Sequence, residues 1–217
     1  MKKFRNLEIY NKLWQQGDID IPIVILVGGA AGTGKTTLCE SIMPFIPYSS
    51  YLSTTLIRSI LRTIFNKQTH PELFANTFDL SSGDDPGELI HNFTKQSSLI
   101  NKYIGGYFES IASEKQHYII EGSNILPQQW DKLTNKIIAI DFYLSAPSED
   151  KLYSDMLCGP TYNREIHNWQ LRNCRQIDSH ILQQARLLNK PIFNYTTPIT
   201  KILELINNRL EQIVNSI

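Results

Sequence analysis

Apolar residues along the chain fall into short continuous runs, separated by longer stretches in which they recur every three or four positions. Continuous runs are typical of buried strands, and the helical spacing indicates amphipathic helices. Five runs predict strands at residues 21–27, 48–53, 117–120, 136–144 and 191–194. Helices are expected at residues 4–14, 37–43, 55–65, 85–113, 148–156, 168–188 and 199–213. This alternation predicts an α/β protein with a mostly parallel sheet covered on both faces, and ligands beyond the carboxyl ends of its strands.

One stretch interrupts this alternation. Residues 66–87 are polar and rich in turn-forming residues, and a long loop inside a compact domain is usually functional or mobile. At the end of the stretch, Asp85 and Glu88 resemble the N-cap and the capping glutamate of the next helix. Gly105 and Gly106 are expected to weaken or bend that helix.

The candidate chemistry begins directly after the first predicted strand. The phosphate-loop pattern Gly-x-x-x-x-Gly-Lys-Thr is complete from Gly29 to Thr36, with a strand before it and a helix after it. Glycines let successive N–H groups turn inward around phosphates, and the helix adds the positive end of its dipole. The nucleotide-binding residues are therefore expected to be Gly29, Ala30, Ala31, Gly32, Thr33, Gly34, Lys35, Thr36 and Thr37.

Two residues of the loop have distinct expected roles. Lys35 is expected to reach the β- and γ-phosphates as a mobile charge, and the Thr36 hydroxyl to ligate Mg²⁺. A second magnesium ligand should end a neighbouring strand. Glu121 fits, because it follows the apolar run 118–120; Asp141 is a rival, but its mid-strand position favours a structural role. The sequence thus predicts a site for ATP and Mg²⁺.

Length, charge and cysteine content limit the kinds of protein that this chain can be. The 217 residues suit one sizeable domain. The balance of 21 basic and 21 acidic residues does not indicate a polyanion-binding surface, and it leaves a local basic patch open. We expect neither a membrane span nor a secretory signal, and therefore a cytoplasmic protein.

The three cysteines, Cys39, Cys158 and Cys174, suggest no disulfide framework or zinc site. Each is expected to be a packing residue, although the helix start next to Cys39 leaves a redox role open.

An ordered set of segments resembles 2-phosphoglycerate kinases and related small P-loop kinases. It begins with residues 23–37, which look like the opening of these kinases. Residues 52–58 resemble the family segment Ser-Thr-Asp-x-Ile-Arg, residues 90–96 its Gly-Phe-x-x-Gln helix, and residues 119–127 its Val-Ile-Glu-Gly-Val-His-Leu-Val-Pro strand end. Residues 171–185 and 191–194 resemble the last Ile-Arg helix and the last strand.

This resemblance implies a P-loop kinase-type three-layer fold with a central five-stranded sheet. It implies a single domain over residues 1–217, with an N-terminal helix and lead-in at 1–20 and a small helical lid at about residues 145–167. It also implies that Arg58 faces an acidic group of the acceptor, that Glu121 serves the metal or the acceptor, and that Arg172 lies near the phosphates.

The sequence departs from the family pattern at two places. Thr55 stands where the family has an aspartate, and a threonine cannot accept a proton in the same way. The family lid is rich in arginine, whereas residues 148–163 contain Lys151 but no arginine, and Gly159 precedes Pro160 where the family has an arginine. Arg164 is then the remaining candidate for a lid cation.

The leading hypothesis is a kinase of a small, anionic metabolite, with 2-phosphoglycerate as the first candidate. Lys35, Glu121, Arg58 and Arg172 are its expected catalytic residues. A nucleoside kinase, a zeta-toxin-like sugar-nucleotide kinase and an antibiotic phosphotransferase also fit. A nucleotide-binding regulator with weak or no turnover is the alternative from another class, because of Thr55 and the lid. A motor, GTPase or helicase is disfavoured, and no nucleic-acid partner is expected, since neither an Asn-Lys-x-Asp segment nor interleaved basic and aromatic residues occur. The oligomeric state stays open.

Overall fold

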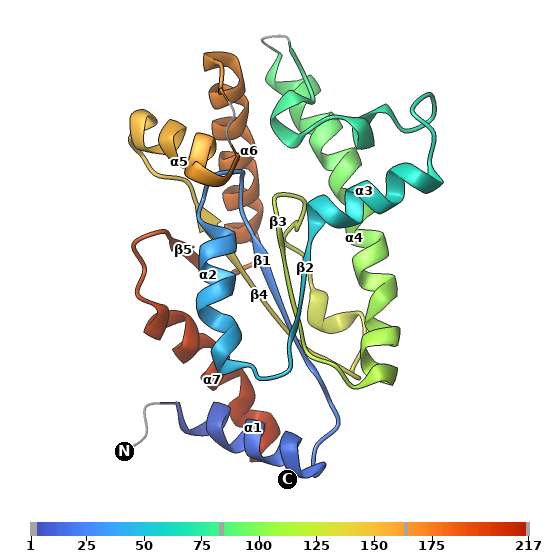
Figure 1. Ribbon diagram of the computed structural model, residues 1–217, viewed down its shortest axis with the longest axis vertical. Coiled ribbons are helices and arrows are strands. Elements are labelled where there is room, and N and C mark those ends of the chain that lie inside the picture. Colours follow the sequence, from blue (N-terminus) through green and yellow to red (C-terminus); the bar gives the residue numbers. More distant parts are fainter. Residues whose placement is uncertain (1–3, 83–84, 163–164, 216–217) are drawn as a thin grey trace.

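A five-stranded sheet forms the centre of the structure, a computed structural model that describes residues 4–82, 85–162 and 165–215 (Figure 1). The strands are β1 (Ile23–Gly28), β2 (Ser50–Ser53), β3 (Tyr118–Gly122), β4 (Ile138–Ser145) and β5 (Ile192–Asn194). Their order is β2-β3-β1-β4-β5, and every pairing is parallel. The expected mostly parallel sheet is thus entirely parallel over the described strands, because each connection crosses back to the same edge of the sheet. Three connections contain α-helices, and the one between β3 and β4 contains only the 3₁₀ helix η4 (Trp130–Lys132).

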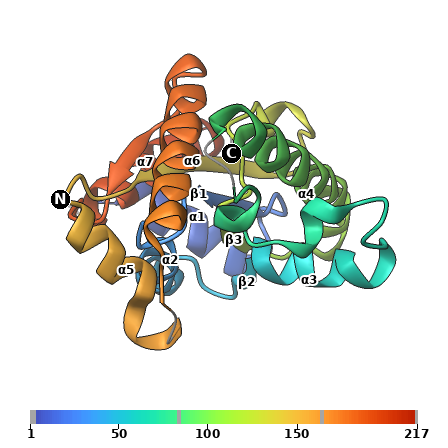
Figure 2. The same cartoon turned by 90° about the horizontal axis from the view of Figure 1, so that it is seen from above.

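Helices cover both faces of this sheet. They are α1 (Arg5–Gln16), α2 (Lys35–Ile42), α3 (Thr54–Ile64), α4 (Pro86–Glu114), α5 (Asp150–Tyr162), α6 (Asn168–Leu187) and α7 (Ile199–Val214). Helices α1, α2 and α7 pack on one face, and α4 and α6 on the other. Seen from above, α3 and α5 project on opposite sides of the molecule (Figure 2). None of the helices in the described ranges is long and apolar enough to cross a membrane.

The apolar run of β1 explains why both faces are covered. Side chains alternate between the faces of a strand. Val24 and Leu26 join the apolar cluster with α4 and α6, whereas Ile23, Ile25 and Val27 join the cluster with α1, α2 and α7. All six residues of β1 are buried. The predicted three-layer arrangement is therefore confirmed.

The stretch before α4 is more ordered than its composition suggested. It contains two short 3₁₀ helices, η2 (Pro71–Phe74) and η3 (Thr77–Asp79). Asp85 caps α4 as expected, since its Oδ1 accepts the Gly87 N–H at 2.8 Å. Glu88 has a further contact, since its carboxylate accepts the Ser81 hydroxyl at 2.6 Å and so ties the stretch to α4. Helix α4 also continues through the pair of glycines at 105–106.

A buried histidine joins β3 to the N-terminal helix. The His117 side chain is 1% exposed, its Nδ1 accepts the Ile23 N–H at 3.1 Å, and its ring lies 4.0 Å from that of Trp14. Burial lowers the pKa of His117 to about 4, from an ordinary value of 6.5. The imidazole is therefore neutral in the folded protein at physiological pH.

This burial predicts a pH dependence of stability. Because the unfolded chain binds the proton more tightly, the free energy of unfolding should be highest above pH 6.5 and fall towards pH 4, by up to about 3 kcal/mol. His117→Gln keeps an acceptor for the Ile23 N–H but does not titrate, and should flatten this slope. Urea unfolding of both proteins between pH 4.5 and 7 measures it; equal slopes would contradict the assignment.

Candidate nucleotide and acceptor site

A cavity of about 810 Å³ lies at the carboxyl ends of β1 and β3. Its lining residues come from the phosphate loop and α2 (31–37 and Glu40), α3 and its start (Thr54, Thr55, Arg58), residues 76–78, residues 121–124, and α5 (Asp155, Met156, Gly159). The structure thus brings Lys35, Thr36, Glu121 and Arg58 to one cavity. This is the edge of a parallel sheet at which ligands were expected.

The backbone of the phosphate loop fits an anion. Gly29, Gly32 and Gly34 have φ values of 141°, 72° and 87°, which disfavour side chains. A Cβ on Gly29 would also lie 2.5 Å from the Leu144 carbonyl oxygen. Gly34 precedes α2 without a side-chain cap, so the first-turn N–H groups of this helix are available to a ligand. The residues present therefore fit a chain of phosphates.

Lys35 is held inside the same loop. Its side chain is 7% exposed, and its Nζ donates to the Ala30 carbonyl oxygen at 2.7 Å. Burial lowers the pKa of Lys35, and the nearby Glu121 carboxylate opposes this shift. The ammonium group of Lys35 therefore lies against the loop that would bind the phosphates.

Glu121 meets Thr36 across the site. The Thr36 hydroxyl lies 3.5 Å from Glu121 Oε1, and the Tyr51 hydroxyl donates to the same oxygen at 2.8 Å. Mg²⁺ is commonly held by one or two protein oxygens together with substrate phosphates, so Thr36 and Glu121 fit its protein ligands. Within the described ranges, no group of three or more His, Cys, Asp or Glu residues could hold a metal ion.

Tyr51 was missed by the sequence analysis. Ser53 of β2 pairs with Glu121 of β3, and Tyr51, two residues earlier, projects to the same face. Burial, and secondly Glu121, raise the pKa of the Tyr51 phenol, so it stays a hydrogen-bond donor. An aromatic residue two positions before a strand end was the available signal, but its meaning depends on the strand register.

The rival carboxylate lies elsewhere. Asp141 is paired with Lys190 at 2.9 Å, and it accepts the Tyr143 hydroxyl at 3.1 Å. It stands opposite Leu26 in the middle of the sheet and is not among the cavity-lining residues. These contacts support the structural role expected for it.

Arg58 lines the cavity but is occupied by the protein. Its two terminal nitrogens donate to the Ala75 carbonyl oxygen and, at 3.0 Å, to Asn76 Oδ1. Burial lowers the pKa of Arg58 to about 10, so the guanidinium remains charged at neutral pH. Gln96 of α4 donates to the same Ala75 oxygen at 3.1 Å. That Arg58 faces an acceptor stays a prediction.

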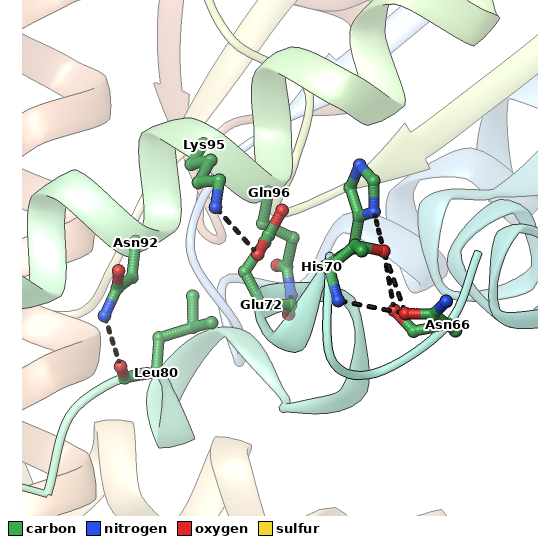
Figure 3. A network of polar contacts seen from close by, with 8 residues as sticks. Asn66, His70, Glu72, Leu80, Asn92, Lys95 and Gln96 are labelled. Atoms are coloured by element: carbon green, nitrogen blue, oxygen red, sulfur yellow. Dashed lines mark hydrogen bonds and ion pairs between the residues drawn. The ribbon is translucent and has the colours of Figure 1, made fainter.

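Helices α4 and α6 hold the segment on both sides of Ala75 and Asn76, the hydrogen-bond partners of Arg58. Asn173 Nδ2 donates to the carbonyl oxygens of Phe78 and Ser81 at 2.9 and 2.8 Å. Figure 3 shows the α4 side, where Asn92 donates to the Leu80 carbonyl oxygen at 3.0 Å and Lys95 pairs with Glu72 at 3.3 Å. The cavity wall at residues 76–78 is therefore fixed by two helices.

Helix α5, the predicted lid, is fastened to the phosphate loop. The Tyr153 hydroxyl donates to the Ala31 carbonyl oxygen at 2.8 Å. Arg175 of α6 lies 4.5 Å above the Tyr153 ring and bonds Asp150 at 3.0 Å. Gly159 has a non-helical φ of 44° within α5. Whether this segment moves as a lid stays a prediction, and Arg164 lies outside the described residues.

Arg172 is the one expected catalytic residue that the cavity does not include. It is exposed on α6 and is not among the lining residues. Its expected place near the phosphates is untested.

The carboxyl group of Asp178 and the thiol of Cys39 are both buried near the site. Asp178 is 8% exposed, accepts the Ala146 N–H at 3.0 Å, and has its pKa raised by burial; an acid on an apolar helix face was the signal for it. Cys39 is fully buried, and burial raises its thiol pKa. A redox role of Cys39 is therefore disfavoured, and its packing role is supported.

Comparisons with known proteins agree with this geometry. The 2-phosphoglycerate kinase of Methanocaldococcus jannaschii is 23% identical over 206 residues, which cover 89% of this chain and 66% of the relative. That of Pyrococcus horikoshii is 23% identical, with 89% and 67% covered. The chain is similar to 2-phosphoglycerate kinases. The resemblance expected from the sequence is thus confirmed, and the chain spans about two thirds of the length of these relatives. No family model matches.

The fold has a counterpart among solved structures. A gluconokinase from Sinorhizobium meliloti superposes with a TM-score of 0.51 at 15% identity, and the match covers 90% of this chain and 95% of the gluconokinase. At this identity the match concerns the fold. It confirms the expected P-loop kinase-type fold.

The contact between Tyr51 and Glu121 gives a testable prediction. Tyr51→Phe removes the hydroxyl that orients the carboxylate, so the Mg²⁺ concentration that half-saturates ATP binding should rise roughly three- to tenfold. ATP affinity at saturating Mg²⁺ should stay unchanged. Calorimetric titration of ATP at a series of Mg²⁺ concentrations measures both, with Tyr48→Phe as control because Tyr48 is 77% exposed. Equal Mg²⁺ dependence in both variants would count against the role of Tyr51.

Proposed function

We propose that this protein is an ATP- and Mg²⁺-dependent phosphotransferase that acts on a small metabolite. One observation supports this most strongly: a complete phosphate loop and the Glu121 carboxylate share a cavity with a separate polar wall. The similarity to proteins named kinases supports the same reaction class. We expect a cytoplasmic protein without nucleic-acid or membrane partners.

Each part of the cavity has a role in this proposal. The N–H groups of residues 29–37 would bind the nucleotide phosphates, and Lys35 would exchange the Ala30 carbonyl oxygen for a phosphate oxygen. Thr36 and Glu121 would hold Mg²⁺, which, when bound, neutralises phosphate charge. Catalysis would consist of positioning and charge stabilisation. Arg172 would act on the transferred phosphate, as the family resemblance implies.

The acceptor suggested by the named relatives is 2-phosphoglycerate, an anionic metabolite. Arg58, the cation of the acceptor side of the cavity among the described lining residues, is the group that would meet its charge. Nucleosides, sugar nucleotides and antibiotics are the other acceptors to be tested. The proposal of 2-phosphoglycerate rests on similarity, whereas the proposed reaction class also rests on the loop and Glu121.

Phosphoryl transfer from MgATP to a panel of acceptors, followed by phosphorus NMR, tests the reaction class. Lys35→Ala should lower kcat/KM by roughly 10²–10³-fold, because a buried cation on the transferred phosphate is lost. Lys201→Ala is the matched control, since Lys201 is exposed on α7 and pairs with Glu204 of the same helix at 3.3 Å. Transfer that survives in Lys35→Ala would point to a contaminating kinase and contradict the proposal.

Thr55 favours one second candidate, a nucleotide-binding regulator with little turnover. This candidate predicts MgATP binding without acceptor-dependent release of ADP. Thr55→Asp would then create activity, because it adds a carboxylate at the cavity wall. In a working kinase the same change should leave the rate unchanged or lower it. A coupled assay of ADP release on wild type and Thr55→Asp separates the two candidates.

A further inference from the structure

The side chain of Gln96 connects two parts of the cavity wall. Gln96 lies on α4 and is fully buried, and Figure 3 shows it extending from this helix towards Glu72 of η2. Its Nε2 donates to the carbonyl oxygens of Glu72 and, at 3.1 Å, of Ala75. Its Oε1 accepts a hydrogen bond from Asn124 Nδ2 at 2.8 Å. One buried amide thus contacts the stretch before α4 and the segment that follows β3.

The hydrogen-bond partners fix the orientation of both amides. Backbone carbonyl oxygens only accept, so the atom of Gln96 that faces Glu72 and Ala75 must be its NH₂ group. Oε1 then faces Asn124, which must present its own NH₂ group in turn. The same Nδ2 of Asn124 also donates to Ser97 Oγ at 3.0 Å. Both N–H groups of the Asn124 amide are therefore used inside the protein.

This arrangement leaves the side-chain oxygen of Asn124 for a ligand. Asn124 lines the cavity and is 3% exposed, and the described residues provide no donor to its Oδ1. Its backbone carbonyl oxygen is held as well, since Asn101 Nδ2 donates to it at 2.7 Å. A group fixed in this way binds a ligand at a low entropic cost. The matching group on a small metabolite is a hydroxyl, which donates to such an oxygen.

Arg58 provides a different contact in the same cavity. Two of its five N–H groups donate to uncharged oxygens, on Ala75 and Asn76. Its positive charge therefore has no ion pair among the described residues. The Ala75 oxygen also accepts from Gln96, so Gln96 holds the carbonyl group that orients Arg58. An anionic group of a ligand would thus meet a cation whose place is already set.

We propose that Gln96 is a positioning residue of the acceptor site, which holds Arg58 for an anionic group of the acceptor and Asn124 Oδ1 for an acceptor hydroxyl. This inference rests on the proposed phosphotransfer, and it adds Asn124 as a substrate contact. The acceptor class is a small hydroxy acid or its phosphate ester. The acceptor suggested by similarity, 2-phosphoglycerate, belongs to this class, since it carries a carboxylate, a phosphate and a free hydroxyl.

Asn124 would orient the hydroxyl without taking its proton, because an amide is a very weak base. During transfer the hydroxyl oxygen bonds to the γ-phosphorus, and the bond from this phosphorus to the β–γ bridging oxygen breaks. ADP leaves, and the hydroxyl proton passes to solvent. The hydrogen bond to Asn124 fixes the direction of the O–H bond, so that a lone pair of the oxygen can face the phosphorus.

The test compares ligands that differ by one hydroxyl group. 2-Phosphoglycerate and 2-phospholactate share the carboxylate and the phosphate, and only the first has a hydroxyl on its third carbon. D-glycerate and D-lactate form the same pair without the phosphate. Calorimetry with a non-hydrolysable ATP analogue and Mg²⁺ present gives the Kd of each ligand. In the wild type, the hydroxyl should strengthen binding about three- to tenfold in at least one pair.

Variants of the two amides assign this difference to residues. In Asn124→Ala both members of the pair should bind equally, because the accepting oxygen is lost. In Gln96→Met the difference should fall below about twofold, and both members should bind about three- to tenfold more weakly, because Arg58 is less well oriented. Gln96→Glu keeps the oxygen that faces Asn124 and loses the donor to Ala75. It should therefore weaken both ligands and keep the difference between them.

Asn92→Ala is the matched control for Gln96→Met. It removes a hydrogen bond between α4 and the same stretch of chain, but at Leu80, which is not among the cavity-lining residues. It should lower the midpoint of urea unfolding and leave the effect of the ligand hydroxyl as in the wild type. A merely structural role of Gln96 would make the two variants alike in both measurements, and would contradict the inference.

The other outcomes separate this inference from the proposed function. Equal binding within both pairs by the wild type, or a hydroxyl effect that survives in Asn124→Ala, would overturn it. Failure of all four ligands to bind would overturn it as well. None of these results touches the phosphotransferase, which fails separately if binding of MgATP does not depend on Lys35 and no acceptor of the wider panel is phosphorylated.

Discussion

Burial of β1 on both faces of the sheet is the constraint on which the rest of the site depends. The strand lies between β3 and β4, and none of its side chains reaches solvent. Its end is therefore fixed, and the phosphate loop begins at a defined point beneath the Leu144 carbonyl oxygen. The parallel register also places Glu121 opposite Val27, directly beside that loop. The hydrophobic effect that buries β1 thus fixes the positions of the phosphate loop and of Glu121 at the carboxyl edge of the sheet.

Helix α6 connects the two walls that face the loop. Through Arg175 it holds α5, whose Tyr153 bonds the loop at Ala31. Through Asn173 it holds the carbonyl oxygens of Phe78 and Ser81 on the acceptor side. A shift of α6 would therefore act on both sides of the cavity. This arrangement suits a reaction in which two ligands must be positioned against each other.

Local pattern was sufficient to predict part of this site. The loop and Glu121 could be identified because a strand end, a glycine pattern and a following helix are properties of neighbouring residues. Tyr51 and Thr77 could not, since their places depend on the pairing of β2 with β3 and on the fold of the stretch before α4. Arg58 was expected within a helix, but its burial could not be predicted, because it packs against a segment that periodicity left unassigned. Long-range contacts, which no local pattern encodes, account for these differences.

A crystal structure with a non-hydrolysable ATP analogue and Mg²⁺ tests the central claim most directly. We expect the phosphates on the N–H groups of residues 29–37, with Lys35 moved from Ala30 to a phosphate oxygen. Mg²⁺ should lie between the Thr36 hydroxyl and the Glu121 carboxylate. A nucleotide bound elsewhere, or phosphates in the loop with Lys35 still on Ala30 and Glu121 remote from the metal, would contradict this account.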